Sequence, residues 1–348
     1  MKITAYGVRP IEVQYFEKLN IYNYQLNLVP EMLSHENAID AKGSDAVLLR
    51  GTCVGDRENL AKFKSWGIDY VFTRTVGFDH VDLKAAKELG IKVARVPGYS
   101  PYAVAELAMT LGMTLFRNVS AEMTNTHDGN FKVLDSYFSR EIHSSTVGII
   151  GCGRIGATEA SLYAGMGTRV IGYDKQPDKQ PDKQPDKQPD KQPDNEPVKN
   201  GVDLVSLEEL LKESDIISLH VPFIPGNTEN MIDTKELEMT KDDAILINTA
   251  RAQVVNMEAV TDALINHKIG GYGADVLVDE GDIFGKDFAK LSDLPNVEVY
   301  KMMDQFPNVI VTPHVGSFTK PALEDMISVS YKNFHEVLET GTCANELV

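Results

Sequence analysis

Three side chains that can handle a carbonyl group and a proton each follow an apolar run in this 348-residue sequence: Arg251, Glu280 and His314. The planar guanidinium of an arginine can hold a carboxylate and a neighbouring carbonyl oxygen together. An imidazole exchanges protons near neutral pH, and a carboxylate partner such as Glu280 would fix its tautomer. Taken singly, the arginine fits a surface ion pair and the histidine a structural role. Together they predict reduction of a small 2-oxo acid, or the reverse oxidation.

A glycine motif would supply the redox partner. Gly151, Gly153 and Gly156 have Gly-x-Gly-x-x-Gly spacing, after a strand predicted at 147–150 and before a helix predicted at 157–164. The first glycine permits a tight turn, the second lets the backbone approach a pyrophosphate, and the third lets helix and strand pack closely. The pyrophosphate would lie at the positive helix N-terminus. We include Arg154, for its charge, and Ile155 in the predicted cofactor-binding set.

Asp174 ends the next predicted strand, 18 residues after Gly156. An acidic residue near this spacing bonds the ribose hydroxyls of a dinucleotide. Its negative charge would repel a 2′-phosphate, so NAD is predicted in preference to NADP. The alternative is an aspartate that serves only a turn.

Composition excludes several other classes. The net charge of −17 argues against nucleic acid and anionic membranes as partners. No uncharged apolar stretch reaches the about 20 residues of a membrane span, and the N-terminus reads as a strand without a signal peptide. The three cysteines, at 53, 152 and 343, have no metal-ligand spacing and are odd in number, so we expect no metal and no disulfide framework. A reducing, cytoplasmic compartment is predicted.

Short apolar runs alternate with helical patterns along the chain. A first series predicts strands at 46–49, 70–73 and 91–94, with helices at 56–66 and 82–89 between them. Ser100 and Pro101 open a helix that extends to about residue 116. A second series predicts strands at 146–150, 169–173, 215–219, 244–247, 271–274 and 308–312, and a last helix at 320–340 stops at Gly341. This alternation predicts an α/β fold with parallel sheets.

One segment departs from this pattern. Lys-Gln-Pro-Asp occurs five times in tandem, from 175 to 194. A proline at every fourth residue excludes a helix or a central strand, and the tract has no apolar side chain to bury. We predict a solvated, extended loop; a binding tail is the less favoured alternative.

The sequence resembles the D-2-hydroxyacid dehydrogenase family over nearly its full length, apart from this tract. The resemblance rests on Arg-Thr-Val-Gly-Phe-Asp-His-Val-Asp at 74–82, Val-Pro-Gly-Tyr-Ser-Pro at 96–101, the glycine motif, His-Val-Pro at 220–222, Asn-Thr-Ala-Arg at 248–251, Gly-Ala-Asp-Val-Leu at 273–277 and Thr-Pro-His at 312–314. It implies two Rossmann-like domains with parallel sheets, in which an NAD-binding domain (101–314) is inserted into a discontinuous catalytic domain (1–100 and 315–348). A homodimer is also implied.

The resemblance implies a role for each matching residue. Arg251 would bind the substrate carboxylate and polarise the carbonyl, His314 would donate the proton, and Glu280 would pair with His314. Asp275 would lie near the nicotinamide and influence that pair. Further substrate contacts would come from the backbone of Val76 and Gly77 and from Tyr99. Further NAD contacts would come from Val221, Pro222, Asn227, Thr249 and Ala250, together with Arg251, Asp275 and His314.

The substrate side chain is less determined. Within the family the chain resembles the branch of D-lactate, D-2-hydroxyisocaproate and (R)-2-hydroxyglutarate dehydrogenases, and the last through Leu-Arg-Gly-Thr-Cys at 49–53 and Phe-Gly-Lys-Asp at 284–287. Arg50 ends a predicted strand and would read a second carboxylate, or would be a solvated strand-end arginine. Both 2-oxoglutarate-type and lactate-type substrates therefore stay open. A different class on the same fold, an NAD-sensing corepressor that mainly binds a partner, is the alternative function.

Overall fold

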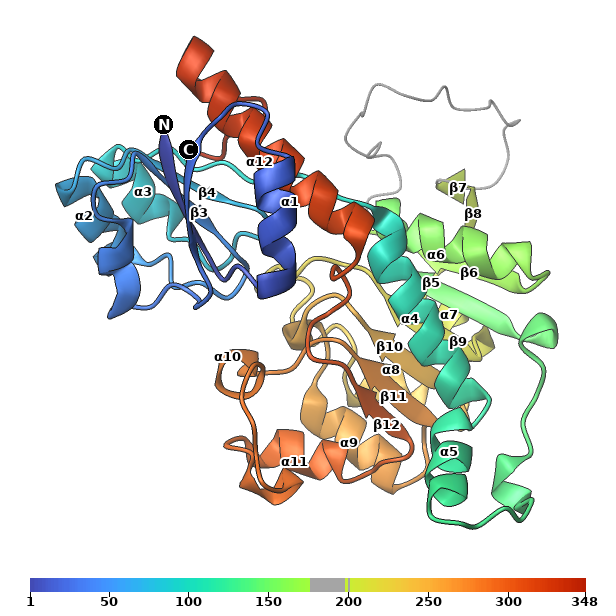
Figure 1. Ribbon diagram of the computed structural model, residues 1–348. Helices are drawn as coiled ribbons and strands as arrows, with labels where there is room; N and C mark the ends of the chain where they lie inside the picture. Colours follow the sequence, from blue (N-terminus) through green and yellow to red (C-terminus); the bar gives the residue numbers. More distant parts are fainter. Residues whose placement is uncertain (176–197, 200) are drawn as a thin grey trace. The chain divides into compact units, whose positions relative to one another are not determined.

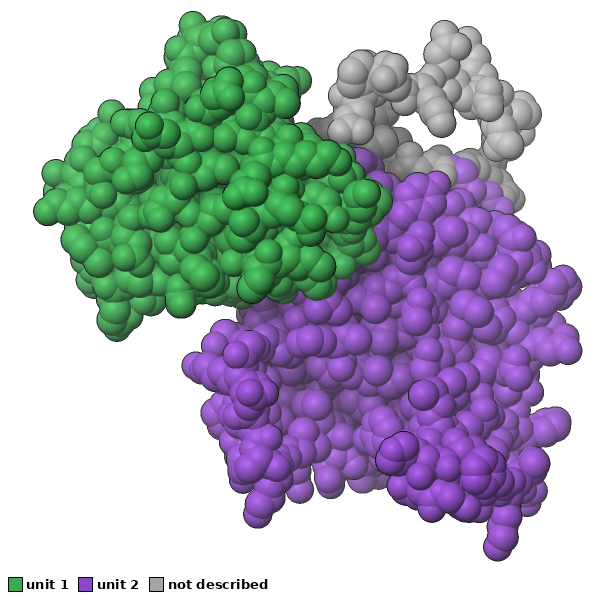
Figure 2. Space-filling model, in the orientation of Figure 1, with its two compact units in different colours: residues 1–100, 317–348 green, residues 101–316 purple. Residues whose placement is uncertain are grey.

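The computed structural model describes residues 1–175, 198–199 and 201–348, which form two compact units (Figures 1 and 2). Unit 1 contains Met1–Ser100 and Ser317–Val348, and unit 2 contains Pro101–Gly316. The chain leaves unit 2 two residues later than the sequence predicts. Of the tandem tract at 175–194, only Lys175 belongs to the described residues, so the loop predicted there lies outside them.

Unit 1 is built on a parallel sheet with strand order β2-β1-β3-β4. The strands are β1 (Lys2–Tyr6), β2 (Gln25–Val29), β3 (Ala46–Leu49) and β4 (Tyr70–Thr73). Helices α2 (Arg57–Ser65) and α3 (Leu83–Leu89) cover one face, and α1 (Val13–Lys18) and α12 (Lys320–Thr340) cover the other (Figure 1). Alternate side chains of β3 enter the two cores, so all four of its residues are buried.

The segment 91–94 differs from its predicted strand. Lys92 forms an isolated parallel bridge with Tyr70, and Ala94 forms an isolated antiparallel bridge with Glu346. Its amide groups are divided between β4 and the C-terminal tail, so neither neighbour gives it a continuous ladder.

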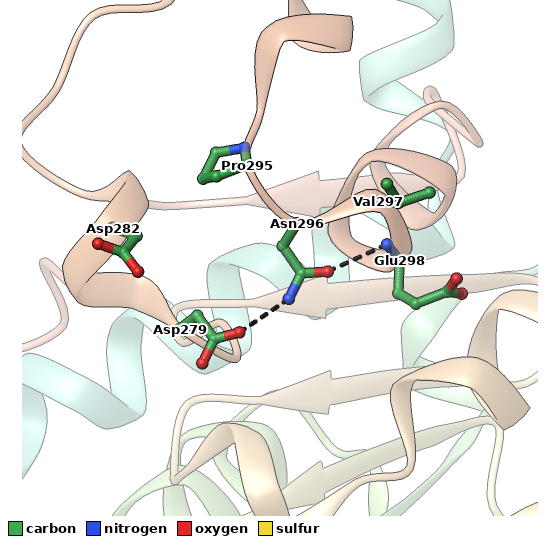
Figure 3. Close-up of a pocket in the computed structure, with 6 residues that line it drawn as sticks. All are labelled: Asp279, Asp282, Pro295, Asn296, Val297 and Glu298. Atoms are coloured by element: carbon green, nitrogen blue, oxygen red, sulfur yellow. Dashed lines mark hydrogen bonds between the residues drawn. The ribbon is translucent and has the colours of Figure 1, made fainter.

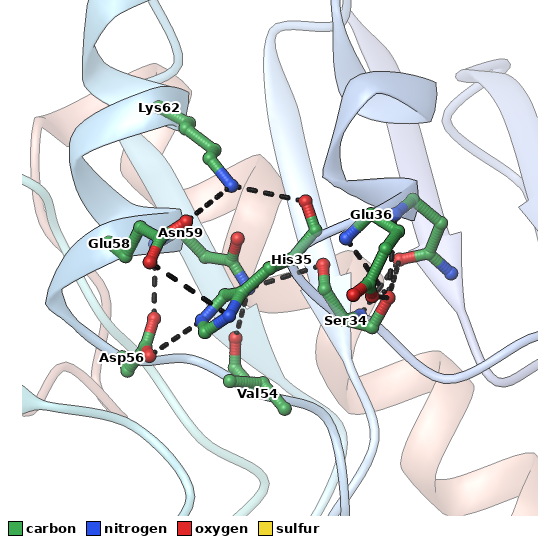
Figure 4. A network of polar contacts seen from close by, with 9 residues as sticks. Ser34, His35, Glu36, Val54, Asp56, Glu58, Asn59 and Lys62 are labelled. Atoms are coloured by element: carbon green, nitrogen blue, oxygen red, sulfur yellow. Dashed lines mark hydrogen bonds and ion pairs between the residues drawn. The ribbon is translucent and has the colours of Figure 1, made fainter.

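A polar network fixes the start of α2 in unit 1 (Figure 4). Asp56 is the N-cap residue and accepts a hydrogen bond from the backbone N–H of Asn59 at 3.1 Å. Its other oxygen lies 2.8 Å from Nε2 of His35. Burial alone would raise the pKa of Asp56, but these hydrogen bonds outweigh it and the pKa is lowered. The network thereby joins the helix N-terminus to the loop that follows β2.

Unit 2 is built on a larger sheet, with the order β12-β11-β10-β9-β5-β6-β8-β7 among the described residues. Its strands are β5 (Thr146–Ile150), β6 (Arg169–Tyr173), β7 (Val198–Lys199), β8 (Val202–Leu204), β9 (Ile216–Leu219), β10 (Ile245–Asn248), β11 (Gly271–Ala274) and β12 (Val309–Val311). All pairs are parallel except β7 with β8. The predicted α/β class with parallel sheets is therefore confirmed. The strand order reverses between β5 and β9, where open sheets of this type bind ligands.

Helices cover both faces of this sheet (Figure 1). Helices α4 (Pro101–Phe116) and α6 (Arg154–Gly165) share one core with β5, β9 and β10. Helices α7 (Leu207–Glu213), α8 (Thr234–Glu238), α9 (Met257–Ile265) and α11 (Val297–Met303) share the other. The remaining helices are α5 (Val119–His127) and the short α10 (Glu280–Ile283). In the described ranges, no helix has the length and apolar character that would cross a membrane.

The network in Figure 4 generates a stability prediction. Asp56→Ala should lower the free energy of unfolding by about 1 kcal/mol, because the cap of α2 is lost, whereas Asp56→Asn should keep most of it. Urea unfolding at pH 7 measures both. The lowered pKa makes the carboxylate's contribution complete above about pH 4.5, and it should fade as the pH falls through the folded-state value. Equal stability of Asp56→Ala and the parent protein would contradict the capping role.

Candidate active site

The carboxyl ends of the unit 2 strands carry the predicted site residues in a fixed order. His314 follows β12, Asp275 and Glu280 follow β11, and Arg251 follows β10. Val221 lies two residues beyond β9, Gly151 follows β5, and Asp174 follows β6. Because these strands are parallel neighbours, the residues line one edge of the sheet, from the predicted reacting groups at β12 to the predicted ribose ligand at β6.

The glycine loop has the shape that a pyrophosphate requires. Gly151 has φ +95°, and a Cβ atom there would lie 2.8 Å from the backbone carbon of His220. A Cβ on Gly156 would lie 2.2 Å from the Gly151 carbonyl oxygen, so only glycine permits this approach of α6 to β5. Gly153 is the N-cap of α6, and nothing lies within 4 Å of its Cβ position. The loop is therefore closely packed at Gly151 and Gly156 and open at Gly153, as the three predicted glycine roles require.

Two further features of unit 2 fit a dinucleotide. The carboxylate of Asp174 accepts the backbone N–H of Cys152 at 3.0 Å, which places it against the glycine loop. Next to it, Nζ of Lys175 donates to Oδ1 of Asn227 at 3.1 Å, so this predicted contact lies near the end of β6. The hydroxyl of Thr249 is buried without a hydrogen-bond partner among the described residues, as expected of a group that bonds a cofactor. The residues present thus fit NAD.

Arg251 lies in a turn that is fixed by Asn248. The buried Asn248 side chain accepts the N–H of Ala250 at 3.0 Å and donates to the carbonyl oxygen of Arg251 at 3.0 Å. The guanidinium of Arg251 donates to the Ala250 carbonyl oxygen at 2.8 Å. These bonds fix the backbone of Arg251 just beyond the end of β10.

His314 and Glu280 are in direct contact. Nδ1 of His314 lies 2.8 Å from Oε1 of Glu280, so the carboxylate orients the ring and Nε2 is left as the other exchangeable site. His314 itself has φ +52°, and Asp279, just before Glu280, has φ +56°. Non-glycine residues rarely adopt this conformation, which costs about 1–3 kcal/mol and is concentrated at functional sites.

Asp275 fixes the loop that carries His314. Its carboxylate is buried and accepts from the Thr312 hydroxyl at 2.6 Å and from the backbone N–H groups of Val315 and Gly316 at 2.8 and 2.7 Å. These donors lie on both sides of His314 in the sequence. Asp275 therefore holds the histidine through its backbone.

A hollow of about 290 Å³ lies between residues 279–282 and residues 295–298 (Figure 3). Asn296 points across it, donates to Asp279 at 3.0 Å and accepts the backbone N–H of Glu298 at 3.0 Å. The carboxylates of Asp279, Asp282 and Glu298 line the hollow, so it repels anions. Its role is structural, because Asn296 joins the start of α11 to the turn that precedes Glu280.

In unit 1, the predicted substrate contacts Val76 and Gly77 follow β4. The Val76 carbonyl oxygen accepts from Arg95 at 3.1 Å, and the Gly77 carbonyl oxygen accepts from the Thr75 hydroxyl at 2.7 Å. Both carbonyl groups are thus bonded within unit 1, which holds this backbone in one conformation. The predicted pocket residue Tyr99 belongs to the same unit, in the segment just before α4.

The edge of the unit 1 sheet also gathers three arginines. Arg9, Arg50 and Arg74 follow β1, β3 and β4. Arg74 is buried and donates to Glu12 at 2.9 Å and to the Gly7 carbonyl oxygen at 2.8 Å. Arg50 approaches the same carbonyl oxygen at 3.5 Å. Three guanidinium groups against one carboxylate leave a surplus of two positive charges.

The effect of this surplus positive charge is seen in the pKa of Arg50. Burial, with the positive charges of Arg9 and Arg74, lowers its pKa to about 10. The group still carries its charge near neutral pH, in a place where an anion would relieve the repulsion.

Some of the contacts around the site residues have no signal in the sequence. Glu12 and Arg74 lie 62 positions apart, and nothing in their spacing predicts their contact. Asn248 had a usable signal, because an asparagine at a strand end favours a turn. Glu159 lies inside a helix predicted from the glycine motif, and it emerges as buried against His220 only in the structure.

Comparison with known proteins identifies the family. Residues 109–316 match the model of the NAD-binding domain of D-isomer specific 2-hydroxyacid dehydrogenases. The chain is 34% identical to an aromatic 2-oxoacid reductase of Clostridium sporogenes, covering 100% of this chain and 99% of that protein. It is 33% identical to D-lactate dehydrogenase of Escherichia coli over 100% of both chains.

A solved structure agrees with these matches. The NAD-complexed D-isomer specific 2-hydroxyacid dehydrogenase of Lactobacillus delbrueckii ssp. bulgaricus superposes with a TM-score of 0.79 at 31% identity, over 100% of both chains. The fold, the glycine loop and these matches lead to one conclusion. The chain belongs to the D-2-hydroxyacid dehydrogenase family, as an NAD-dependent oxidoreductase that interconverts 2-oxo and 2-hydroxy acids.

Proposed function

We propose that this enzyme reduces 2-oxo acids to (R)-2-hydroxy acids with His314 as proton donor, Glu280 as its partner and Arg251 as the substrate-binding cation. The observation that carries this assignment is the 2.8 Å contact between His314 and Glu280, on the sheet edge that also bears the glycine loop. Bound NADH supplies the hydride to the carbonyl carbon. The reaction consumes one proton, and a 2-hydroxy acid and NAD⁺ result.

His314 delivers this proton to the carbonyl oxygen. Glu280 occupies Nδ1, so the proton leaves from Nε2. The carboxylate stabilises the imidazolium before transfer and keeps the ring in place as the charge is lost. Asp275 keeps the backbone of the histidine fixed, which preserves the distance over which the proton moves.

Arg251 interacts with the negative charges of the substrate. Its fork binds the substrate carboxylate and lies beside the carbonyl oxygen, where negative charge develops as hydride arrives. The turn fixed by Asn248 removes most of the reorganisation that a free arginine would need. In unit 1, the backbone N–H groups of Val76 and Gly77 are proposed as further substrate contacts.

For the substrate side chain, we propose that Arg50 binds a second carboxylate, as in 2-oxoglutarate. The surplus of positive charge around Glu12 and the lowered pKa of Arg50 support this assignment. Val76 and Gly77 follow β4, the neighbour of β3, so both ends of a dicarboxylate would be bound at one edge of the unit 1 sheet.

We also propose a homodimer. The segment from α5 to residue 138 exposes Met123, Phe131, Val133 and Phe138, of which the last two are 93% exposed. Such a concentration of apolar side chains is typical of an interface, and a second copy of this chain would cover it.

A cytoplasmic location is our last proposal for this enzyme. The cysteines at 53, 152 and 343 are all free and buried, so no disulfide supports either unit. A reducing compartment suits this arrangement. Secretion into an oxidising compartment in the source cell would contradict it.

The proton-donor role gives the first prediction here. His314→Gln should lower kcat by about 10²–10⁴-fold, because general acid catalysis is lost, while the affinity for NADH is kept. Glu280→Gln should lower kcat less, because the ring keeps a hydrogen-bond partner. Single-turnover oxidation of NADH, with NADH binding measured separately by fluorescence, checks both. Near-normal turnover by His314→Gln would contradict the assignment of His314 as the proton donor.

The second prediction concerns specificity. Arg50→Ala should lower kcat/KM for 2-oxoglutarate by about 10- to 100-fold, since a charge-assisted contact is lost, and should leave kcat/KM for pyruvate nearly unchanged. Arg50→Lys, which keeps a charge without the planar fork, should lie between. A parent enzyme that prefers pyruvate, or a variant that loses both substrates equally, would refute the dicarboxylate proposal.

The third prediction concerns assembly. The double substitution Phe131→Glu, Phe138→Glu should convert the dimer to a particle of 38.5 kDa in light scattering, because two charges would be desolvated at the interface. Ile21→Glu is the matched control, since Ile21 is 75% exposed but lies in unit 1, and it should stay dimeric. A parent protein of 38.5 kDa at micromolar concentration would rule out the dimer.

A further inference from the structure

Unit 2 contains a buried carboxylate–imidazole pair that the reaction described above does not use. Glu159 lies on α6, three residues beyond the last motif glycine, and is 0% exposed. Its carboxylate is hydrogen-bonded to Nε2 of His220, whose side chain is 2% exposed. The Ser218 hydroxyl lies 3.1 Å from the same ring nitrogen, Nε2.

The pair is costly as a purely structural device. One carboxylate oxygen, Oε1 of Glu159, is buried without a hydrogen-bond partner within the described part of the chain. A carboxylate away from water is stabilised only by its partners, and here the imidazole of His220 is the main one. An apolar side chain of similar size would fill this space without that cost, and local departures of this kind are concentrated at functional sites.

His220 also forms the floor of the glycine loop. Its backbone N–H donates to the Ile150 carbonyl oxygen at 2.8 Å. Its backbone carbon and oxygen lie 2.8 and 2.9 Å from the position that a Cβ atom on Gly151 would take. Val221 and Pro222, the predicted NAD contacts, follow immediately. The backbone of His220 thus determines both the depth of the loop and the direction of the next two residues.

The side chain of His220 therefore connects two walls of the dinucleotide site. One wall is the turn after β9, and the other is α6, which the third motif glycine brings close to β5. Without Glu159, the imidazole would lose its link to α6 and would keep only the contact with the Ser218 hydroxyl, within the same strand end.

We propose that Glu159 is a positioning residue for NAD, acting through His220 to hold the turn after β9 against the glycine loop. Its contribution lies in the affinity for the dinucleotide and not in the transfer of hydride or proton. This inference rests on the proposed function only in taking the glycine loop as the NAD site.

The experiment measures NADH binding by fluorescence titration, with no 2-oxo acid present. Glu159→Met, which fills the space without charge, should raise the Kd for NADH and for ADP-ribose by about tenfold, in line with the effect of losing a group that orients a ligand-binding residue. Glu159→Gln should stay within about threefold of the parent, because its amide oxygen still accepts from the imidazole. Ser161→Ala, an exposed change on the same helix, should leave the Kd unaltered.

Two readouts separate this role from general support of the fold. The rate of hydride transfer at saturating NADH should stay within about threefold of the parent in Glu159→Met. His220→Ala should weaken NADH binding, and the double variant should be no weaker than the worse single variant, since both changes break one link.

Unchanged NADH affinity in Glu159→Met, or additive effects in the double variant, would overturn the proposal. A loss of hydride-transfer rate with the Kd unchanged would overturn it as well. Failure of the parent protein to bind NADH would instead count against the proposed function, so the two failures are distinguishable.

Discussion

The carboxylate of Asp275 is the contact on which the geometry of the proposed active site depends. Its two oxygens accept three hydrogen bonds from residues on either side of His314, and its own N–H donates to the end of β10, the strand that leads to Arg251. One buried group thus links the ends of β10, β11 and β12. The positive φ of His314 is maintained because its neighbours on both sides are bonded to this carboxylate. The proposed acid and the proposed substrate cation consequently share one rigid support.

Unit 1 faces a different constraint, which is repulsion. Glu12 forms ion pairs with both Arg74 and Arg9, but one carboxylate cannot neutralise three guanidinium groups, and burial beside the other two lowers the pKa of Arg50. Desolvation of Arg50 makes its remaining charge costly in the free protein and available to an incoming anion. The same arrangement explains why backbone carbonyl oxygens such as that of Gly7 accept more than one guanidinium. The second carboxylate of a dianionic substrate would reduce the repulsion at Arg50, whereas a substrate with one carboxylate would leave this repulsion in place.

Much of this architecture could be predicted from short-range patterns. The strand ends, the glycine turn and the place of Arg251 and His314 follow from apolar runs and the residues that end them, because parallel strands bring their carboxyl ends to one edge. The last helix has the predicted bounds, Lys320–Thr340, and stops at Gly341 as predicted. The family and its NAD chemistry, expected from the quoted motifs, are confirmed by the comparisons.

The rest depends on contacts between residues far apart in the chain. The compensation of Arg74 by Glu12, and of Glu159 by His220, involves charges whose burial only the packed fold reveals. The segment 91–94 satisfies its amides on two sides, which no local pattern encodes. The roles of the individual site residues, and the part of Arg50 in specificity, remain predictions for the experiments above.

The burial of all three thiols has a practical consequence for how the molecule opens. Cys53 and Cys343 lie in the cores of unit 1, and Cys152 lies in the glycine loop of unit 2 with its side chain in a core of that unit. A thiol reagent can reach them only when the surrounding packing opens, so the labelling rate of each cysteine reports the local unfolding equilibrium around it. The labelling rates therefore report on the two units separately, Cys53 and Cys343 on unit 1 and Cys152 on unit 2. Because Cys152 belongs to the glycine loop, the rate at which it is labelled should fall when NADH is added. The size of that decrease would give the binding energy that stabilises this part of unit 2.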